Sequence, residues 1–174
     1  MQHLGPLMFY MSKGKKGDAA CRAVAEKLDI LGLNYAASRY EEDCLTYPNR
    51  IMVGSETIIG ELPYNWEQVK KHPAIIGDFA WAAIDYLGEA GIGQMIPQDT
   101  PGLPIAAGSG AIDLTGNITA EAYFQQTVWG LRKAPYLGVR PLIWSHKKMT
   151  GSAWRMTNAV ESWTWPGCEG QKAT

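Results

Sequence analysis

Short apolar runs alternate with segments of helical periodicity through much of this 174-residue chain. Runs bounded by polar or turn-forming residues predict buried β-strands at residues 28–35, 50–57 and 74–81. Their apolar cores begin with steps of 21 and 24 residues between them, near Ile30, Ile51 and Ile75. That spacing is typical of strand–helix units, so the pattern predicts an α/β fold with neighbouring parallel strands.

Helical segments are expected before, between and after these runs. Asp18 can cap a helix over residues 18–28, with its apolar residues on one face. A second helix is expected over residues 64–72 and ends before a proline. A third is expected over residues 119–131, with Thr119 as its N-cap residue.

The predicted strands end in side chains that suit recognition of a sugar. Asn34 and Tyr35 end the first strand, Glu56 ends the second, and Trp81 and Asp85 belong to the third or follow it. Because the carboxyl ends of parallel strands meet at one edge, we expect these side chains at one rim. An aromatic face stacks on a sugar ring while polar groups bind its hydroxyls. A Glu56 that only caps the following turn is the alternative, and this segment by itself leaves both open.

The later part of the chain has a different character. Residues 88–116 are rich in glycine and proline, which predicts a long functional loop or an insertion. After residues 134–140 the pattern changes to short β-like runs at 139–144, 153–157 and 158–165. We therefore predict two domains, residues 1–136 and residues 137–174. The second is too short to form a core of its own.

Composition narrows the function mainly by exclusion. Hydrophobic residues make up 46% and charged residues 19%, which is ordinary for a globular chain, and the net charge is −1. No basic field favours nucleic acid as a partner. No apolar stretch reaches the length of a membrane span, and residues 4–11 lack the features of a signal peptide, so a cytoplasmic location is favoured without being established.

Cysteine and histidine usage gives no sign of a metal site or a cofactor. The three cysteines are odd in number and irregularly spaced, which predicts free thiols in a reducing compartment. The three histidines are too scattered to form a ligand set. We expect no metal and no cofactor on this chain.

Several segments in the right order resemble one enzyme family. Residues 40–43, 50–57 and 76–93 resemble bacterial β-galactosidases of glycoside hydrolase family 2. Residues 160–170 look like the start of the β-sandwich that follows the catalytic barrel in those proteins. The resemblance begins near Asp18 and covers nearly all of the chain after it.

This resemblance implies strands six to eight of a (β/α)₈ TIM barrel, followed by the start of an all-β immunoglobulin-like sandwich. It implies a retaining exo-glycosidase that acts on a β-galactoside or a related oligosaccharide. Glu56 matches the nucleophile, Tyr35 matches a tyrosine that assists it, and Trp81 matches a tryptophan of the sugar pocket. Asp85 stands where the family often has an acidic residue, and Asn34 is a further substrate-binding candidate.

Retaining hydrolysis needs a second carboxyl group about 5–5.5 Å from the nucleophile. In the family this acid/base is the glutamate of an Asn-Glu pair at the end of strand four, and this sequence contains no such pair. A complete barrel also needs about 250 residues. We therefore expect the chain to be inactive alone, which leaves open a partner that carries the missing half of the barrel, or a homo-oligomer.

Other functions remain open on the sequence. Glucuronidases of the family carry an Asn-x-Lys motif, but residues 114–119 offer no lysine in register, which favours galactosides over glucuronides. A β-mannosidase is less well supported. A module that binds carbohydrate or a partner without catalysis, and a purely structural remnant, are alternatives from other classes.

Overall fold

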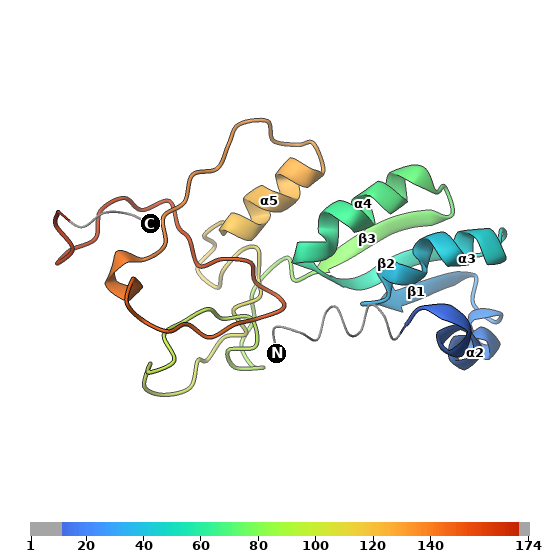
Figure 1. The fold of residues 1–174 in the computed structure, drawn as a ribbon, viewed down its shortest axis with the longest axis horizontal. Helices are drawn as coiled ribbons and strands as arrows, with labels where there is room; N and C mark the ends of the chain where they lie inside the picture. Colours follow the sequence, from blue (N-terminus) through green and yellow to red (C-terminus); the bar gives the residue numbers. More distant parts are fainter. Residues whose placement is uncertain (1–11, 171–174) are drawn as a thin grey trace. The chain divides into compact units, whose positions relative to one another are not determined.

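A computed structural model describes residues 12–170, which divide into two units at residues 81 and 82. The first unit contains a sheet of three parallel strands in the order β1-β2-β3 (Figure 1). The strands are β1 (Ile30–Asn34), β2 (Ile51–Ile58) and β3 (Ile75–Trp81). The apolar runs thus form the predicted parallel strands of an α/β fold.

Helices precede and connect these strands. The first described helix is α2 (Gly14–Ala25). The connection from β1 to β2 contains η1 (Ala37–Arg39) and α3 (Tyr40–Thr46), and the connection from β2 to β3 contains η2 (Ile59–Glu61) and α4 (Leu62–Lys71). Residues 40–46 were not predicted to be helical. The prediction that Asp18 caps a helix is wrong, because the helix begins four residues earlier and Asp18 accepts hydrogen bonds from Arg22 and Tyr47 instead.

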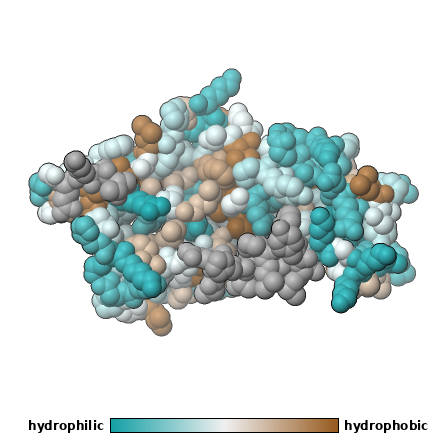
Figure 2. Space-filling model, in the orientation of Figure 1, coloured by the Kyte–Doolittle hydropathy of each residue, from teal (hydrophilic) through white to brown (hydrophobic). Residues whose placement is uncertain are grey.

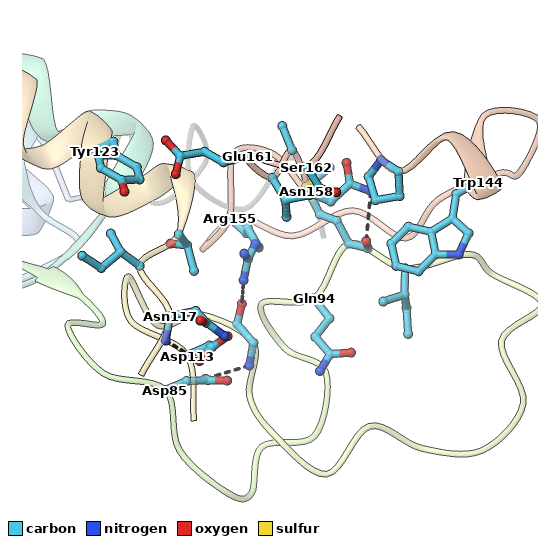
Figure 3. A pocket seen from close by; sticks show the side chains of 18 of the residues that line it. Asp85, Gln94, Asp113, Asn117, Tyr123, Trp144, Arg155, Asn158, Glu161 and Ser162 are labelled. Carbon is cyan, nitrogen blue, oxygen red and sulfur yellow. Dashed lines mark hydrogen bonds between the residues drawn. The ribbon is translucent and has the colours of Figure 1, made fainter. Parts of the chain in front are cut away.

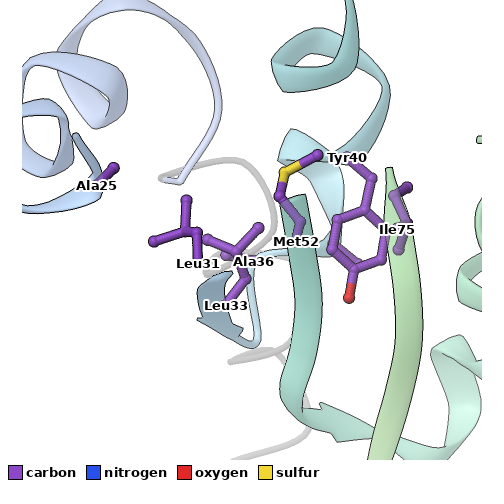
Figure 4. Packing of buried hydrophobic residues seen from close by; sticks show 8 residues of the cluster. Ala25, Leu31, Leu33, Ala36, Tyr40, Met52 and Ile75 are labelled. Atoms are coloured by element: carbon purple, nitrogen blue, oxygen red, sulfur yellow. The ribbon is translucent and has the colours of Figure 1, made fainter. Parts of the chain in front are cut away.

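The core of the first unit lies on one face of the sheet. Leu31, Leu33, Met52 and Ile75 point to this face and are buried. They form one cluster with Ala25 of α2 and Tyr40 of α3, and Figure 4 shows Tyr40 close to Met52 and Ile75. Alternation of side chains along each strand therefore directs one set of apolar residues against the helices.

The opposite face of the sheet also carries apolar residues, but they are exposed. Ile30 and Ile51 are partners in the register of β1 and β2, and they are 47% and 42% exposed. Ile76 of β3 is 56% exposed. In Figure 2 brown apolar residues lie at the surface among teal hydrophilic ones on the side of the molecule in view. Strands with apolar residues on both faces are typical of parallel sheets that are covered on both sides.

The second unit, residues 82–170, has little regular structure. Its elements are α5 (Ala120–Val128) and η3 (Leu142–Trp144), and isolated bridges such as Leu87 with Ala106 pair parts of its loops. The predicted helix ends three residues early, and Thr119 does not cap it through its side chain, since that hydroxyl donates to the Ala111 carbonyl at 2.9 Å.

The β-like runs after residue 139 do not form strands among the described residues. Val139 pairs with Val160 in one isolated antiparallel bridge, and the run at 139–144 includes a 3₁₀ turn. A closed barrel and an immunoglobulin-like sandwich are not observed in residues 12–170, and the proposed division at residue 136 stays a prediction. Residues 4–11, predicted not to be a signal peptide, lie outside the described residues.

Candidate active site

Glu56 stands near the C-terminal end of β2, where Asn34, the last residue of β1, and Tyr35, which follows it, meet the Glu56 carboxylate. The Tyr35 hydroxyl donates a hydrogen bond to Glu56 Oε1, and the Asn34 amide donates to Oε2 at 3.4 Å. The Tyr35 backbone N–H also donates to the Glu56 carbonyl at 2.7 Å. The sequence prediction that these three residues lie together is confirmed.

A β-bulge shapes this end of β2. Leu33 pairs with Gly54, and the next residue of β1, Asn34, pairs with Glu56, so Ser55 is an extra residue. The Ser55 hydroxyl donates to Asn34 Oδ1 at 2.6 Å, while the Asn34 amide reaches Glu56. Two successive side chains of β2 therefore meet one residue of β1, as expected where a bulge redirects a side chain.

Tyr35 has an unusual backbone conformation. Its φ is +50°, in the left-handed region that non-glycine residues rarely adopt. Such a conformation costs on the order of 1–3 kcal/mol and persists where the surroundings impose it. Here two hydrogen bonds to Glu56, one from the backbone and one from the side chain, fix the residue.

Trp81 ends β3 at the same end of the sheet. Its register partner on β2 is Ile58, two residues after Glu56. The side chain of Trp81 is partly buried. An aromatic residue thus lies at the strand edge that carries the carboxylate, as the sequence predicted.

A half-buried carboxyl group of β3 was missed by sequence reasoning. Asp78 of β3 accepts hydrogen bonds from Tyr40, Thr57 and Asn65 at 3.1, 3.0 and 3.3 Å. Burial raises the pKa of Asp78 above its ordinary value, although these three hydrogen bonds act in the opposite direction. A single carboxylate inside an apolar strand was the signal available in the sequence.

Asp85 belongs to the second unit, where its carboxylate Oδ1 accepts a hydrogen bond from the Gly108 backbone N–H at 2.9 Å. It lines a pocket of about 950 Å³ within that unit. Figure 3 shows Arg155 in the middle of this pocket, where it donates to the Gly108 carbonyl at 3.0 Å, with Tyr123 and Trp144 among the surrounding residues. Aromatic faces beside charged and amide groups can bind a sugar.

Sequence reasoning did not identify Arg155 or the aromatic residues of this pocket, because residues 123–165 come together only through the irregular fold of this unit. Within residues 12–170 no three histidine, cysteine, aspartate or glutamate side chains are grouped so that they could hold a metal ion. Among the described helices none has the length and apolar character to cross a membrane.

Comparisons with known proteins find similar chains among solved structures. No protein-family model matches the chain, and no curated protein sequence matches it. The chain is similar to the crystal structure of a glycosyl hydrolase family 2 member from Bacteroides cellulosilyticus, with 31% identity and a TM-score of 0.70 over 93% of this chain. A second such member, from Bacteroides cellulosilyticus DSM 14838, gives 29% identity and a TM-score of 0.65 over 88% of this chain.

The matched part of each neighbour is small. The chain spans 21% of the first protein and 18% of the second. It therefore matches a segment of a glycosyl hydrolase family 2 protein along most of its own length. These likenesses support a glycosidase-type segment and do not assign a substrate.

Proposed function

We propose that this chain carries the nucleophile half of a retaining exo-glycosidase, with Glu56 as the nucleophile and Tyr35 as its assistant. The hydrogen bonds of Tyr35 and Asn34 to the Glu56 carboxylate carry this proposal. The likeness to glycosyl hydrolase family 2 members supports it. In this proposal β1, β2 and β3 are strands six to eight of a (β/α)₈ barrel in residues 1–136, and residues 137–174 begin a β-sandwich.

The reaction proceeds by double displacement. A Glu56 carboxylate oxygen attacks the anomeric carbon, and the bond between this carbon and the leaving oxygen breaks. The leaving oxygen keeps the electron pair of that bond and receives a proton from a second carboxylic acid. The resulting carboxylate then removes a proton from water, whose oxygen attacks the anomeric carbon and releases Glu56. Oε2 is the better attacking atom, because Asn34 binds it at 3.4 Å whereas Tyr35 binds Oε1 closely.

The second carboxylic acid comes from outside this sequence, which has no Asn-Glu pair. General acid catalysis contributes about 10²–10⁴-fold, so the chain alone turns over ordinary glycosides negligibly. Its partner is the rest of the barrel, or a second copy of the chain. We propose a β-galactoside as substrate, with Asn34, Trp81 and Asp85 as sugar-binding residues.

A substrate that needs no proton donor tests the nucleophile in this chain. Dinitrophenolate leaves without protonation, so dinitrophenyl β-galactoside should release about one dinitrophenolate per chain in a burst, followed by slow turnover. Phenyl β-galactoside, whose leaving group needs a proton, should give no burst. Azide should speed the second phase, because it attacks the glycosyl–enzyme bond without a base.

Two variants make the test specific. Glu56→Gln should abolish the burst, and Glu67→Gln, an exposed glutamate of α4 paired with Lys70, should leave it unchanged. The dinitrophenyl β-glucuronide and β-mannoside should react more slowly than the galactoside. A burst that survives Glu56→Gln would contradict the nucleophile assignment, and sugar binding without any burst would favour a non-catalytic binding module.

A further inference from the structure

The carboxyl group of Asp78 links β3 to three other elements of the first unit. It lies on the helix-covered face of the sheet and accepts hydrogen bonds from Tyr40 of α3, Thr57 of β2 and Asn65 of α4. Each of these three donors is 0% exposed. Three buried donors fix this carboxyl group in position, because breaking a hydrogen bond to a buried polar group costs free energy.

Two of the contacts of Asp78 lie on either side of the bulge in β2. Gly54 is the register partner of Asp78, and a Cβ added to Gly54 would stand 2.2 Å from Asp78 Oδ1. Thr57, three residues later, has a hydroxyl that can donate to Asp78 Oδ2 at 3.0 Å and to the Phe79 carbonyl at 3.2 Å. In a regular strand two residues three apart would face opposite sides of the sheet.

Gly54 and Thr57 both approach Asp78 because one extra residue lies between them. The register of β2 and β3 shifts between these two positions. Within this interval Ser55 donates to Asn34, and Glu56 accepts from Asn34 and from Tyr35, the residue that follows β1. Fixing both ends of the bulge on one face therefore directs Glu56 towards Tyr35 on the other.

We propose that Asp78 is a positioning residue that acts through Thr57. It holds the bulge of β2 in the register that presents the Glu56 carboxylate to the Tyr35 hydroxyl. The role of Asp78 in catalysis rests on the proposed function of Glu56, whereas the effect of Asp78 on the position of the Glu56 side chain does not.

A purely structural Asp78 makes a different prediction, and two variants separate the possibilities. Thr57→Val and Tyr40→Phe are nearly isosteric, and each removes one hydroxyl that donates to Asp78. Of these two hydroxyls only that of Thr57 belongs to β2, whereas that of Tyr40 comes from α3 and packs against Gly54. A structural role would make the two variants equivalent at the Tyr35–Glu56 contact, but a positioning role makes Thr57→Val the disruptive one.

The readout is the ¹³Cζ resonance of Tyr35 in the whole chain with labelled tyrosine. Tyr35→Phe assigns the resonance, and Glu56→Ala gives its position when the carboxylate is absent. Thr57→Val should move the resonance at least halfway to the Glu56→Ala position. Thr57→Ser, which keeps the hydroxyl, and Tyr40→Phe should leave it at the wild-type position.

Asp78→Ala is the second variant if Thr57→Val does not fold. It removes the oxygen to which Thr57 and Asn65 both donate, so it should move the Tyr35 resonance in the same direction. A Tyr35 resonance that stays in place in the folded variant would overturn the proposal. So would an equal displacement in Tyr40→Phe.

The dinitrophenolate burst separates this inference from the proposed function. If both are correct, Thr57→Val should slow the burst by about 10–100-fold, since a misplaced reacting group reduces the rate by such factors. Thr57→Ser should retain the wild-type burst rate. A resonance that responds to Thr57→Val in a chain without any burst would support the positioning role and contradict the catalytic one.

Discussion

Gly54→Ala should destabilise the first unit strongly, because no room exists for a methyl group at this point of β2. An added Cβ would lie 2.2 Å from both Asp78 Oδ1 and the Tyr40 hydroxyl. Ordinary contact begins near 3.4 Å. Both atoms are held by the hydrogen bond that Tyr40 donates to Asp78 at 3.1 Å, so neither can move without weakening it.

The size of the effect follows from two contributions. Overpacking a filled site costs about 1–3 kcal/mol, and a hydrogen bond to a charged group contributes about 1.5–3 kcal/mol. Moving Tyr40 relieves the overlap but loses the hydrogen bond, so the two costs do not add fully. We expect Gly54→Ala to lower the free energy of unfolding by about 2–4 kcal/mol.

Native-state hydrogen exchange measures this loss within the sheet. The Met52 backbone N–H donates to the Ala74 carbonyl at 2.8 Å, and its exchange should become about 30–700-fold faster in Gly54→Ala, at tenfold for each 1.4 kcal/mol. Gly77→Ala is the matched control on β3, since its added Cβ would meet only Val53 at 3.9 Å. Equal exchange rates in the two variants would refute the packing argument.

Three further predictions concern buried or hydrogen-bonded carboxyl groups. Burial raises the pKa of Asp78 above 3.8, so between pH 3.8 and this raised pKa the native state binds more protons than the unfolded state. The contribution of this group to stability therefore falls as pH rises through that interval and is constant above it. Urea midpoints of the wild type should show this pH dependence, and those of Asp78→Asn should lack it. The hydrogen bond from the Thr115 hydroxyl is the largest cause that lowers the pKa of Asp113, to about 2. A ¹³C titration should therefore find a higher pKa for Asp113 in Thr115→Val. The stability that this carboxylate contributes should be lost as pH falls through its pKa of about 2. Glu121 Oε1 accepts hydrogen bonds from the backbone N–H groups of Met156 and Thr157 at 3.0 and 3.2 Å. Glu121→Ala removes this acceptor, which should cost about 1–3 kcal/mol for each N–H group and speed the hydrogen exchange of both.

The strands of the first unit were predictable because their sequence pattern is local. Each apolar run is bounded by polar or turn residues, and the observed strands begin at Ile30, Ile51 and Ile75 as predicted. Helix α3 was missed because it is only seven residues long and follows a 3₁₀ turn without a side-chain cap. Asp18 lies inside α2 and does not mark its start, because its carboxylate accepts hydrogen bonds from Arg22 one turn later and from Tyr47.

The candidate site was partly predictable for the same reason. The residues at strand ends, Asn34, Tyr35 and Glu56, come together because parallel pairing aligns the ends of β1 and β2. The bulge was not predictable, because an extra residue is defined only by the register of two strands. The three donors around Asp78 come from elements 13 to 38 residues away, which sequence patterns do not connect.

The second unit was predicted least well. Its apolar and aromatic residues after position 139 suggested strands, yet Val139 and Val160 form only an isolated bridge. Aromatic residues such as Trp144 and Trp165 line the pocket instead of a sheet. Alternation of apolar and polar residues predicts a strand only where a neighbouring strand is present to pair with it.

Covalent labelling of the chain tests the central claim most directly. 2-Deoxy-2-fluoro-β-galactosyl fluoride releases fluoride without a proton donor, and its fluorine at C2 slows hydrolysis of the glycosyl–enzyme bond, so the nucleophile should remain labelled. Proteolysis and mass spectrometry should find the fluorosugar on Glu56 in the wild-type chain and on no residue of Glu56→Gln. A label on another residue, or a wild-type chain that stays unlabelled, would contradict the assignment of Glu56 as the glycosidic nucleophile.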